Sequence, residues 1–132
     1  MKKKSGRNQE QSENLKIAVI EEIADDIYSI KFILQSIGYD VESFSSQESY
    51  QEALVECAPQ LVIIDMMISD GQAYQVMKEL GQSRLKKVPI LAITAEAMEG
   101  EEQDVYQAGG QDVLSKPYEV SDLRKKIKKW IK

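Results

Sequence analysis

The stretch Leu61-Val62-Ile63-Ile64-Asp65 decides the fold, because an unbroken apolar run ends in a carboxylate. A run of this length is typical of a strand that is buried on both faces of a parallel sheet. Such a strand delivers its next residue to the carboxyl edge of the sheet, where open α/β folds build their binding sites. We therefore expect Asp65 to lie in a functional site.

Two other apolar runs end in the same way, at side chains that carry oxygen. Residues 17–20 lead into the acidic pair Glu21-Glu22, and residues 88–93 lead into Thr94. The carboxyl ends of parallel strands meet at one edge of a sheet. We therefore predict that these strand ends form one site.

Strand and helix patterns alternate along the whole chain. The strands are expected at residues 15–20, 40–44, 60–64, 88–93 and 111–114. Between them apolar residues recur at helical spacing, and Gly38 is placed to end the first helix. The alternation predicts a flavodoxin-like (βα)5 doubly wound sandwich, with a parallel five-stranded sheet in the order 2-1-3-4-5. The first and third strands are neighbours in that order, which places the acidic pair beside Asp65.

Segment 95–109 gives the weakest helical pattern. It is rich in acids, it contains Gly100, and it has little apolar surface beyond Met98, Val105 and Ala108. Because a helix with little surface to bury is weakly held, we expect this fourth helix to move easily.

Composition limits the chemistry. The length suits one domain, which we place at residues 15–132 after a disordered leader at residues 1–14. The chain has no histidine, which excludes a Ser-His-Asp triad, a Cys-His pair and a histidine-based zinc site. Cys57 is the only cysteine, so no internal disulfide forms and a cytoplasmic location is expected. Clustered carboxylates without histidine favour a hard cation such as Mg²⁺.

Charge and hydropathy limit the classes of partner. No apolar stretch approaches the ~20 residues that span a bilayer, so membrane insertion is not expected. The net charge is −5, with an acidic body and a basic last helix. A nucleic-acid-binding domain would be basic over one broad face, so no direct contact with nucleic acid is expected.

Four short motifs follow one another along the chain. They are Glu21-Glu22, Asp65, Thr94-Ala95 and Lys116-Pro117. This ordered set resembles the receiver domain of two-component response regulators, over about residues 15–131. Residues 65–71 also resemble the family's loop after its phosphorylated aspartate. Each motif is common by itself, whereas the set in this order and spacing is specific.

The resemblance implies a role in phosphoryl transfer for each motif. Asp65 is the implied phosphoacceptor, and Lys116 and Thr94 are the implied contacts to the phosphoryl oxygens. The implied ligands of Mg²⁺, or of Mn²⁺, are Glu21, Glu22, Asp65 and the backbone carbonyl of Met67. The implied switch and partner positions are Thr94, Ala95, Val113 and Pro117. The Lys116–Pro117 peptide bond is often cis in the family.

The resemblance also implies partners. Because the chain has no histidine, a histidine kinase or a histidine phosphotransfer protein is expected to donate the phosphoryl group. The chain would catalyse at most its own phosphorylation and slow dephosphorylation, and so is not a conventional enzyme. A downstream protein is expected to bind the fourth helix, fifth strand and fifth helix. We expect a stand-alone regulator or a receiver that is part of a hybrid kinase or larger regulator.

Several positions depart from the family pattern, and two of them bear most on function. Glu22 stands where an aspartate is usual. Its extra methylene moves the carboxylate by roughly 1.5 Å, which we expect to weaken metal binding. Val113 stands where an aromatic residue is usual, so we expect the signal to run through Thr94 and the fourth helix.

Simpler interpretations exist for each residue alone. Asp65 fits a turn or a helix cap, Glu21-Glu22 fits a solvated first helical turn, and Lys116 fits a surface lysine. The alternative function is a pseudo-receiver, which binds proteins without being phosphorylated. A Mg²⁺-dependent phosphatase or phosphotransferase for small molecules is more remote, because no loop is long enough to enclose a substrate.

Overall fold

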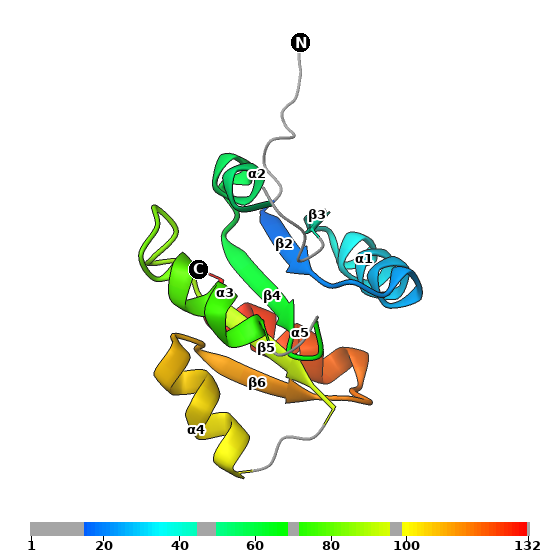
Figure 1. Cartoon of the computed structure of the whole chain (residues 1–132). Coiled ribbons are helices and arrows are strands. Elements are labelled where there is room, and N and C mark those ends of the chain that lie inside the picture. Colours follow the sequence, from blue (N-terminus) through cyan, green and yellow to red (C-terminus); the bar gives the residue numbers. More distant parts are fainter. Residues whose placement is uncertain (1–14, 45–49, 69–71, 96–98, 132) are drawn as a thin grey trace.

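The computed structural model describes residues 15–44, 50–68, 72–95 and 99–131 (Figure 1). The expected leader, the end of the loop after Asp65 and part of segment 95–109 lie outside these ranges. None of the helices in the described ranges has both the length and the apolar content that crossing a membrane requires.

Five parallel strands form one sheet. They are β2 (Lys16–Ile20), β3 (Asp40–Phe44), β4 (Leu61–Asp65), β5 (Ile90–Thr94) and β6 (Asp112–Ser115). Their spatial order is β3-β2-β4-β5-β6, and every neighbouring pair is parallel. Counted along the chain, this is the order 2-1-3-4-5, which confirms the predicted flavodoxin-like fold.

A helix follows each strand. They are α1 (Ala24–Ile37), α2 (Tyr50–Cys57), α3 (Ala73–Leu80), α4 (Glu99–Ala108) and α5 (Val120–Trp130). Gly38 ends α1 as predicted, because its φ of 117° is in the left-handed region that favours glycine. The Gly38 N–H donates to the carbonyls of Leu34 and Gln35, which closes the last helical turn.

The helices cover both faces of the sheet (Figure 1). Alternate strand residues point to opposite faces, so Ile63 packs in one cluster and Ile64 in the other. The first cluster contains Ile30 of α1 and Ile127 of α5, and the second contains residues of α2, α3 and α4. Both faces of β4 are therefore buried, as its apolar run predicts.

The expected strands at residues 60–64 and 88–93 begin too early and end one residue too soon. Asp65 and Thr94 are the last residues of their strands, and they pair in register with Ile93 and Ser115. A strand ends where its neighbours stop pairing with it, and this register is not visible in a single apolar run. Both polar side chains are thus positioned by the ladder of the sheet.

Asp112, the first residue of β6, joins that strand to α5 at the amino-terminal edge of the sheet. Its carboxylate accepts hydrogen bonds from Trp130 Nε1 and Lys126 Nζ, each at 2.9 Å, and from the Val113 N–H at 2.8 Å. Burial by itself would raise the pKa of Asp112. The hydrogen bonds from Trp130 and Lys126 outweigh burial and hold the pKa below its usual value.

Candidate functional site

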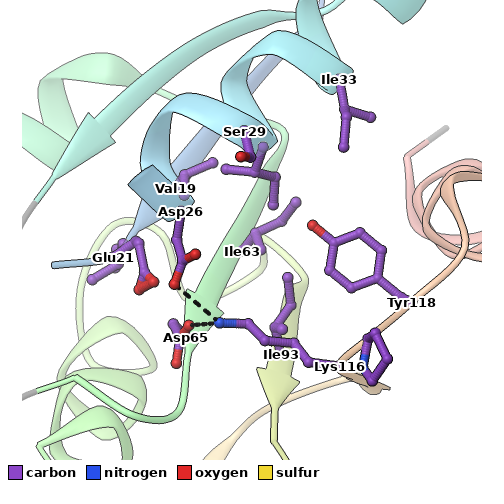
Figure 2. Close-up of a pocket in the computed structure, with 13 residues that line it drawn as sticks. Val19, Glu21, Asp26, Ser29, Ile33, Ile63, Asp65, Ile93, Lys116 and Tyr118 are labelled. Carbon is purple, nitrogen blue, oxygen red and sulfur yellow. Dashed lines mark hydrogen bonds and ion pairs between the residues drawn. The ribbon is translucent and has the colours of Figure 1, made fainter. Parts of the chain in front are cut away.

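An acidic pocket lies at the carboxyl edge of the sheet (Figure 2). Asp65 ends β4, Glu21 directly follows β2, and these two strands are neighbours. Lys116 directly follows β6, and Asp26 lies in the first turn of α1. The apolar wall of the same cavity includes Ile63. The topology therefore brings together Glu21, Asp65 and Lys116, as the sequence predicts.

Lys116 holds the Asp65 carboxylate. Its Nζ lies 2.7 Å from Asp65 Oδ2 and 3.4 Å from Asp26 Oδ2. Burial favours the neutral amine, but the hydrogen bond and charge of Asp65 outweigh it and raise the pKa of Lys116. Asp65 Oδ1 accepts a 2.7 Å hydrogen bond from the Met67 N–H, so both carboxylate oxygens have a donor.

Glu21 is the least satisfied acid of the pocket. Its side chain is only 4% exposed, and its Oε1 accepts a 3.2 Å hydrogen bond from the Glu22 N–H. Its Oε2 is buried with no hydrogen-bond partner among the described residues. Burial, followed by the nearby carboxylate of Asp65, raises the pKa of Glu21 to about 8.

The pocket fits a divalent cation. One oxygen from each of Glu21, Asp26 and Asp65 lies within 4.8 Å of the others. Carboxylate oxygens are the ligands that Mg²⁺ prefers, and a cation would satisfy the buried Glu21 Oε2. The Glu22 carboxylate does not belong to this group of described residues.

The sequence analysis missed Asp26. The only indication of its role in the sequence was its position in the first helical turn after the acidic pair. Acids are common at that position simply because the helix dipole favours them. Its approach to Asp65 depends on the angle at which α1 leaves the sheet, which no local pattern specifies. Met67, whose carbonyl is an expected ligand, lies at the surface of the molecule.

Thr94 is buried at the end of β5, the strand that pairs with β4 and so lies next to the strand of Asp65. Its Oγ1 donates a 2.6 Å hydrogen bond to Glu101 Oε1, which connects the strand to α4. The next residue, Ala95, is exposed. Neither the sequence pattern nor the resemblance predicted the bond to Glu101.

The other two switch positions lie on β6 and directly after it. Val113 is buried, and it belongs to the same cluster as Val105 of α4. Pro117 lines the acidic pocket, and the Lys116–Pro117 peptide bond is cis. The small side chain of Val113 thus packs in the same cluster as α4, whereas Pro117 and Tyr118 line the acidic pocket.

The structure is a doubly wound parallel sheet with an acidic cluster and a lysine at its carboxyl edge, which is the edge where open α/β folds bind ligands. The sequence model of the response regulator receiver domain matches residues 17–128. The chain therefore belongs to the family of response regulator receiver domains.

Named proteins with similar sequences support this family membership. The chain is 28% identical over 116 residues to the alkaline phosphatase synthesis transcriptional regulatory protein PhoP of Bacillus subtilis, covering 87% of this chain and 48% of PhoP. It thus spans about half the length of this relative. It is 24% identical to the polar-differentiation response regulator DivK of Brucella ovis, covering 87% of this chain and 94% of DivK.

Solved structures share the fold. The receiver domain of the sensor histidine kinase PA1611 from Pseudomonas aeruginosa has a TM-score of 0.80 at 24% identity, covering 89% of this chain and 98% of that domain. That domain was solved with a magnesium ion coordinated in its active-site cleft. A putative response regulator from Chloroflexus aurantiacus has a TM-score of 0.82 at 23% identity, with the same coverage of 89% and 98%.

Proposed function

We propose that Asp65 accepts a phosphoryl group from the phosphohistidine of a partner protein and that this changes a protein-binding surface. The observation that carries the proposal is the Asp65 carboxylate, which Lys116 holds at 2.7 Å within a pocket of acids. Aspartate carboxylates act as covalent acceptors of phosphoryl groups. Phosphoryl transfer depends mainly on positioning and charge neutralisation, and this pocket offers both.

In the transfer, a carboxylate oxygen of Asp65 bonds to phosphorus as the bond from phosphorus to the imidazole nitrogen breaks. The electron pair of the broken bond stays on that nitrogen, which leaves a neutral histidine in the partner after proton exchange. Lys116 then lies beside the new phosphoryl oxygens, as it lies beside Asp65 Oδ2. Thr94 offers them a hydroxyl once it leaves Glu101.

A divalent cation supplies neutralisation of the charge on the phosphoryl oxygens. Glu21, Asp65 and the backbone carbonyl of Met67 are the proposed ligands for Mg²⁺, and Mn²⁺ fits the same oxygen ligands. The magnesium ion in the PA1611 receiver domain supports this proposal. Glu22 is the further ligand that the family resemblance implies.

The phosphorylated state adds about −1.5 to −2 units of charge, the figure for phosphorylated hydroxyl side chains, next to the acids of the pocket. Movement of Thr94 toward that charge would break its bond to Glu101 and so release one contact of α4. We propose that a downstream protein reads the resulting change on α4, β6 and α5. Tyr106 of α4 and Val120 of α5 are exposed apolar side chains on that surface.

The test is phosphorylation by a small-molecule phosphodonor such as acetyl phosphate. With Mg²⁺, the intact mass of the wild type should increase by one phosphoryl group, which base removes and a chelator prevents. Asp65→Asn, which keeps the size of the side chain, should gain nothing. A folded wild type that gains no phosphoryl group with Mg²⁺ or Mn²⁺ would favour the pseudo-receiver, for which Glu22 and Val113 are the supporting departures from the family pattern.

A further inference from the structure

Asp26 occupies a place in the acidic pocket where the family resemblance implies no ligand. One of its carboxylate oxygens lies within 4.8 Å of oxygens from both Glu21 and Asp65. Oxygens on opposite sides of a Mg²⁺ ion lie about 4.2 Å apart, twice the length of a Mg–O bond. The spacing of the three acids is thus close to what one bound ion requires, and Figure 2 shows their carboxylates converging.

Glu21 indicates independently that the pocket takes a cation. Its Oε2 is buried, has no hydrogen-bond partner among the described residues, and belongs to an acid that is 4% exposed. An unsatisfied buried carboxylate oxygen is costly, so a native structure normally supplies a partner for it. Lys116 does not supply that partner, because its ion pairs are with Asp65 and Asp26.

The Glu22 carboxylate lies outside the group that Glu21, Asp26 and Asp65 form. The backbone N–H of Glu22 donates to Glu21 Oε1. The side chain is also one methylene longer than the aspartate that is usual at this position. Mg²⁺ requires near-ideal octahedral geometry, so a carboxylate displaced by a methylene is a poor ligand.

We propose that Asp26 of α1, and not Glu22, provides the third carboxylate of the divalent-cation site in this chain. The proposal rests on the metal-assisted function above and identifies the residues that bind the ion. Asp26, in the first turn of α1, thereby takes the place of the aspartate that is usual at position 22. Asp26 then serves both the ion and Lys116, from whose Nζ it lies 3.4 Å away.

The experiment measures Mn²⁺ binding to the unphosphorylated full chain, by the decrease of the free Mn²⁺ signal in electron paramagnetic resonance. Mg²⁺ is then added to displace the bound Mn²⁺. The variants are Asp26→Asn and Glu22→Gln, with Asp25→Asn as the matched control. Asp25 is an exposed acid in the same helical turn, so its variant loses the same charge without losing a ligand.

Asp26→Asn should weaken Mn²⁺ binding at least about tenfold, since even the loss of an outer-sphere partner costs that much. Glu22→Gln and Asp25→Asn should each weaken it less than about threefold, as expected for a change of charge in a screened environment. Asp26→Ser is a second variant, and circular dichroism confirms that each variant is folded.

Loss of binding in Glu22→Gln equal to or greater than the loss in Asp26→Asn would overturn the proposal. So would a wild type that binds no Mn²⁺, or equal losses in Asp25→Asn and Asp26→Asn. Binding is measured without a phosphodonor. A chain that binds Mn²⁺ through Asp26 but gains no phosphoryl group would therefore refute the proposed function alone, and phosphorylation with a metal bound through Glu22 would refute this inference alone.

Discussion

The hydroxyl of Thr94 donates a 2.6 Å hydrogen bond to the carboxylate of Glu101, which ties the end of β5 to α4. If phosphorylation draws Thr94 toward Asp65, this bond must break first. Glu101→Ala should therefore favour the phosphorylated arrangement by roughly fivefold, which corresponds to the ~1 kcal/mol of a typical hydrogen bond. The ratio of phosphorylated to free chain, measured by intact mass at a limiting concentration of acetyl phosphate, checks it.

Glu102→Ala is the matched control for Glu101, because it removes the neighbouring acid of the same helix. It should leave that ratio unchanged. Equal effects of the two variants would mean that the charge of α4, and not the bond to Thr94, sets the equilibrium.

Glu21 should make the metal-free chain less stable as the pH rises. Its pKa is about 8 in the folded chain against an ordinary value of 4.5, so between these values the folded chain holds a proton that the unfolded chain has lost. The free energy of unfolding then falls with pH, by at most about 1.4 kcal/mol per pH unit for one proton. The groups that face Glu21 are Asp65, Asp26 and Lys116.

Glu21→Gln should remove most of that decrease. Urea unfolding from pH 5 to pH 8 in a chelator measures it, with Glu22→Gln as the control. Addition of Mg²⁺ at pH 8 should stabilise the wild type more than Glu21→Gln. A wild type whose stability rises over this pH range would contradict the assignment.

Asp112 should make the chain more stable as the pH rises in the acid range, which is the opposite of the effect of Glu21. Its pKa is below the ordinary value of 3.8 in the folded chain, so its contribution to stability is present above that value and is lost as the pH falls further. Asp112→Asn should lower the free energy of unfolding by about 1–3 kcal/mol at pH 7, because it weakens the bonds to Trp130 and Lys126. The difference from wild type should shrink below pH 3.8.

The fluorescence of Trp130, the only tryptophan, follows this unfolding. Asp122→Asn is the control, since Asp122 is an exposed acid of the same helix. A difference between wild type and Asp112→Asn that does not change with pH would show that packing, and not the ionised carboxylate, is lost.

Exposed aromatic side chains on α1 should contact the phosphodonor protein. Tyr28 is 74% exposed and Phe32 is 65% exposed, and both line one apolar groove on the helix that also carries Asp26. Exposed apolar patches of this kind commonly mark protein-binding sites. Tyr28→Ala and Phe32→Ala should each slow transfer from a phosphorylated histidine phosphotransfer domain by about fivefold or more.

Transfer from acetyl phosphate is the internal control for these variants, because a small donor needs no such contact and its rate should stay unchanged. Tyr106→Ala, on α4, should leave both rates unchanged. If both rates fell together in Tyr28→Ala, the substitution would have disturbed the pocket itself.

Gly110 should be essential for the packing of α4. A Cβ placed there would overlap Val105 Cγ1, so Gly110→Ala should lower the free energy of unfolding by about 1–3 kcal/mol. Gly100→Ala is the contrast, because a Cβ at that position meets nothing within 4 Å. It should stabilise the chain by roughly 0.5–1 kcal/mol, as alanine does within a helix. Thermal unfolding of the two variants compares them directly.

The fold was predictable because the local apolar patterns and the alternation of strands and helices indicate the same architecture. The apolar run before Asp65 identified a strand buried on both faces, and the alternation of strands and helices then specified the strand order. Where the strands end was less predictable, since Asp65 and Thr94 remain in the ladder only because neighbouring strands pair with them. The sheet order alone was sufficient to bring Glu21 to Asp65.

The contacts that the sequence did not predict all join side chains of different elements. Asp26 reaches the pocket through the path of α1, and Asp112 finds Trp130 and Lys126 across the packing of β6 against α5. The bond between Thr94 and Glu101 depends on where α4 begins. Side-chain geometry of this kind follows from tertiary packing, which local propensity does not record.

Directly after the carboxyl-terminal end of α4, the chain passes Gly110, which packs closely against Val105 of that helix. The helix is about 15 Å long at 1.5 Å per residue, and its buried residues Val105 and Ala108 lie in its carboxyl-terminal half. A rotation about the chain at Gly110 would displace the surface near Glu101 several times further than the surface near Ala108. A protein that distinguishes the phosphorylated from the unphosphorylated chain through α4 would therefore gain most by binding the amino-terminal half of the helix.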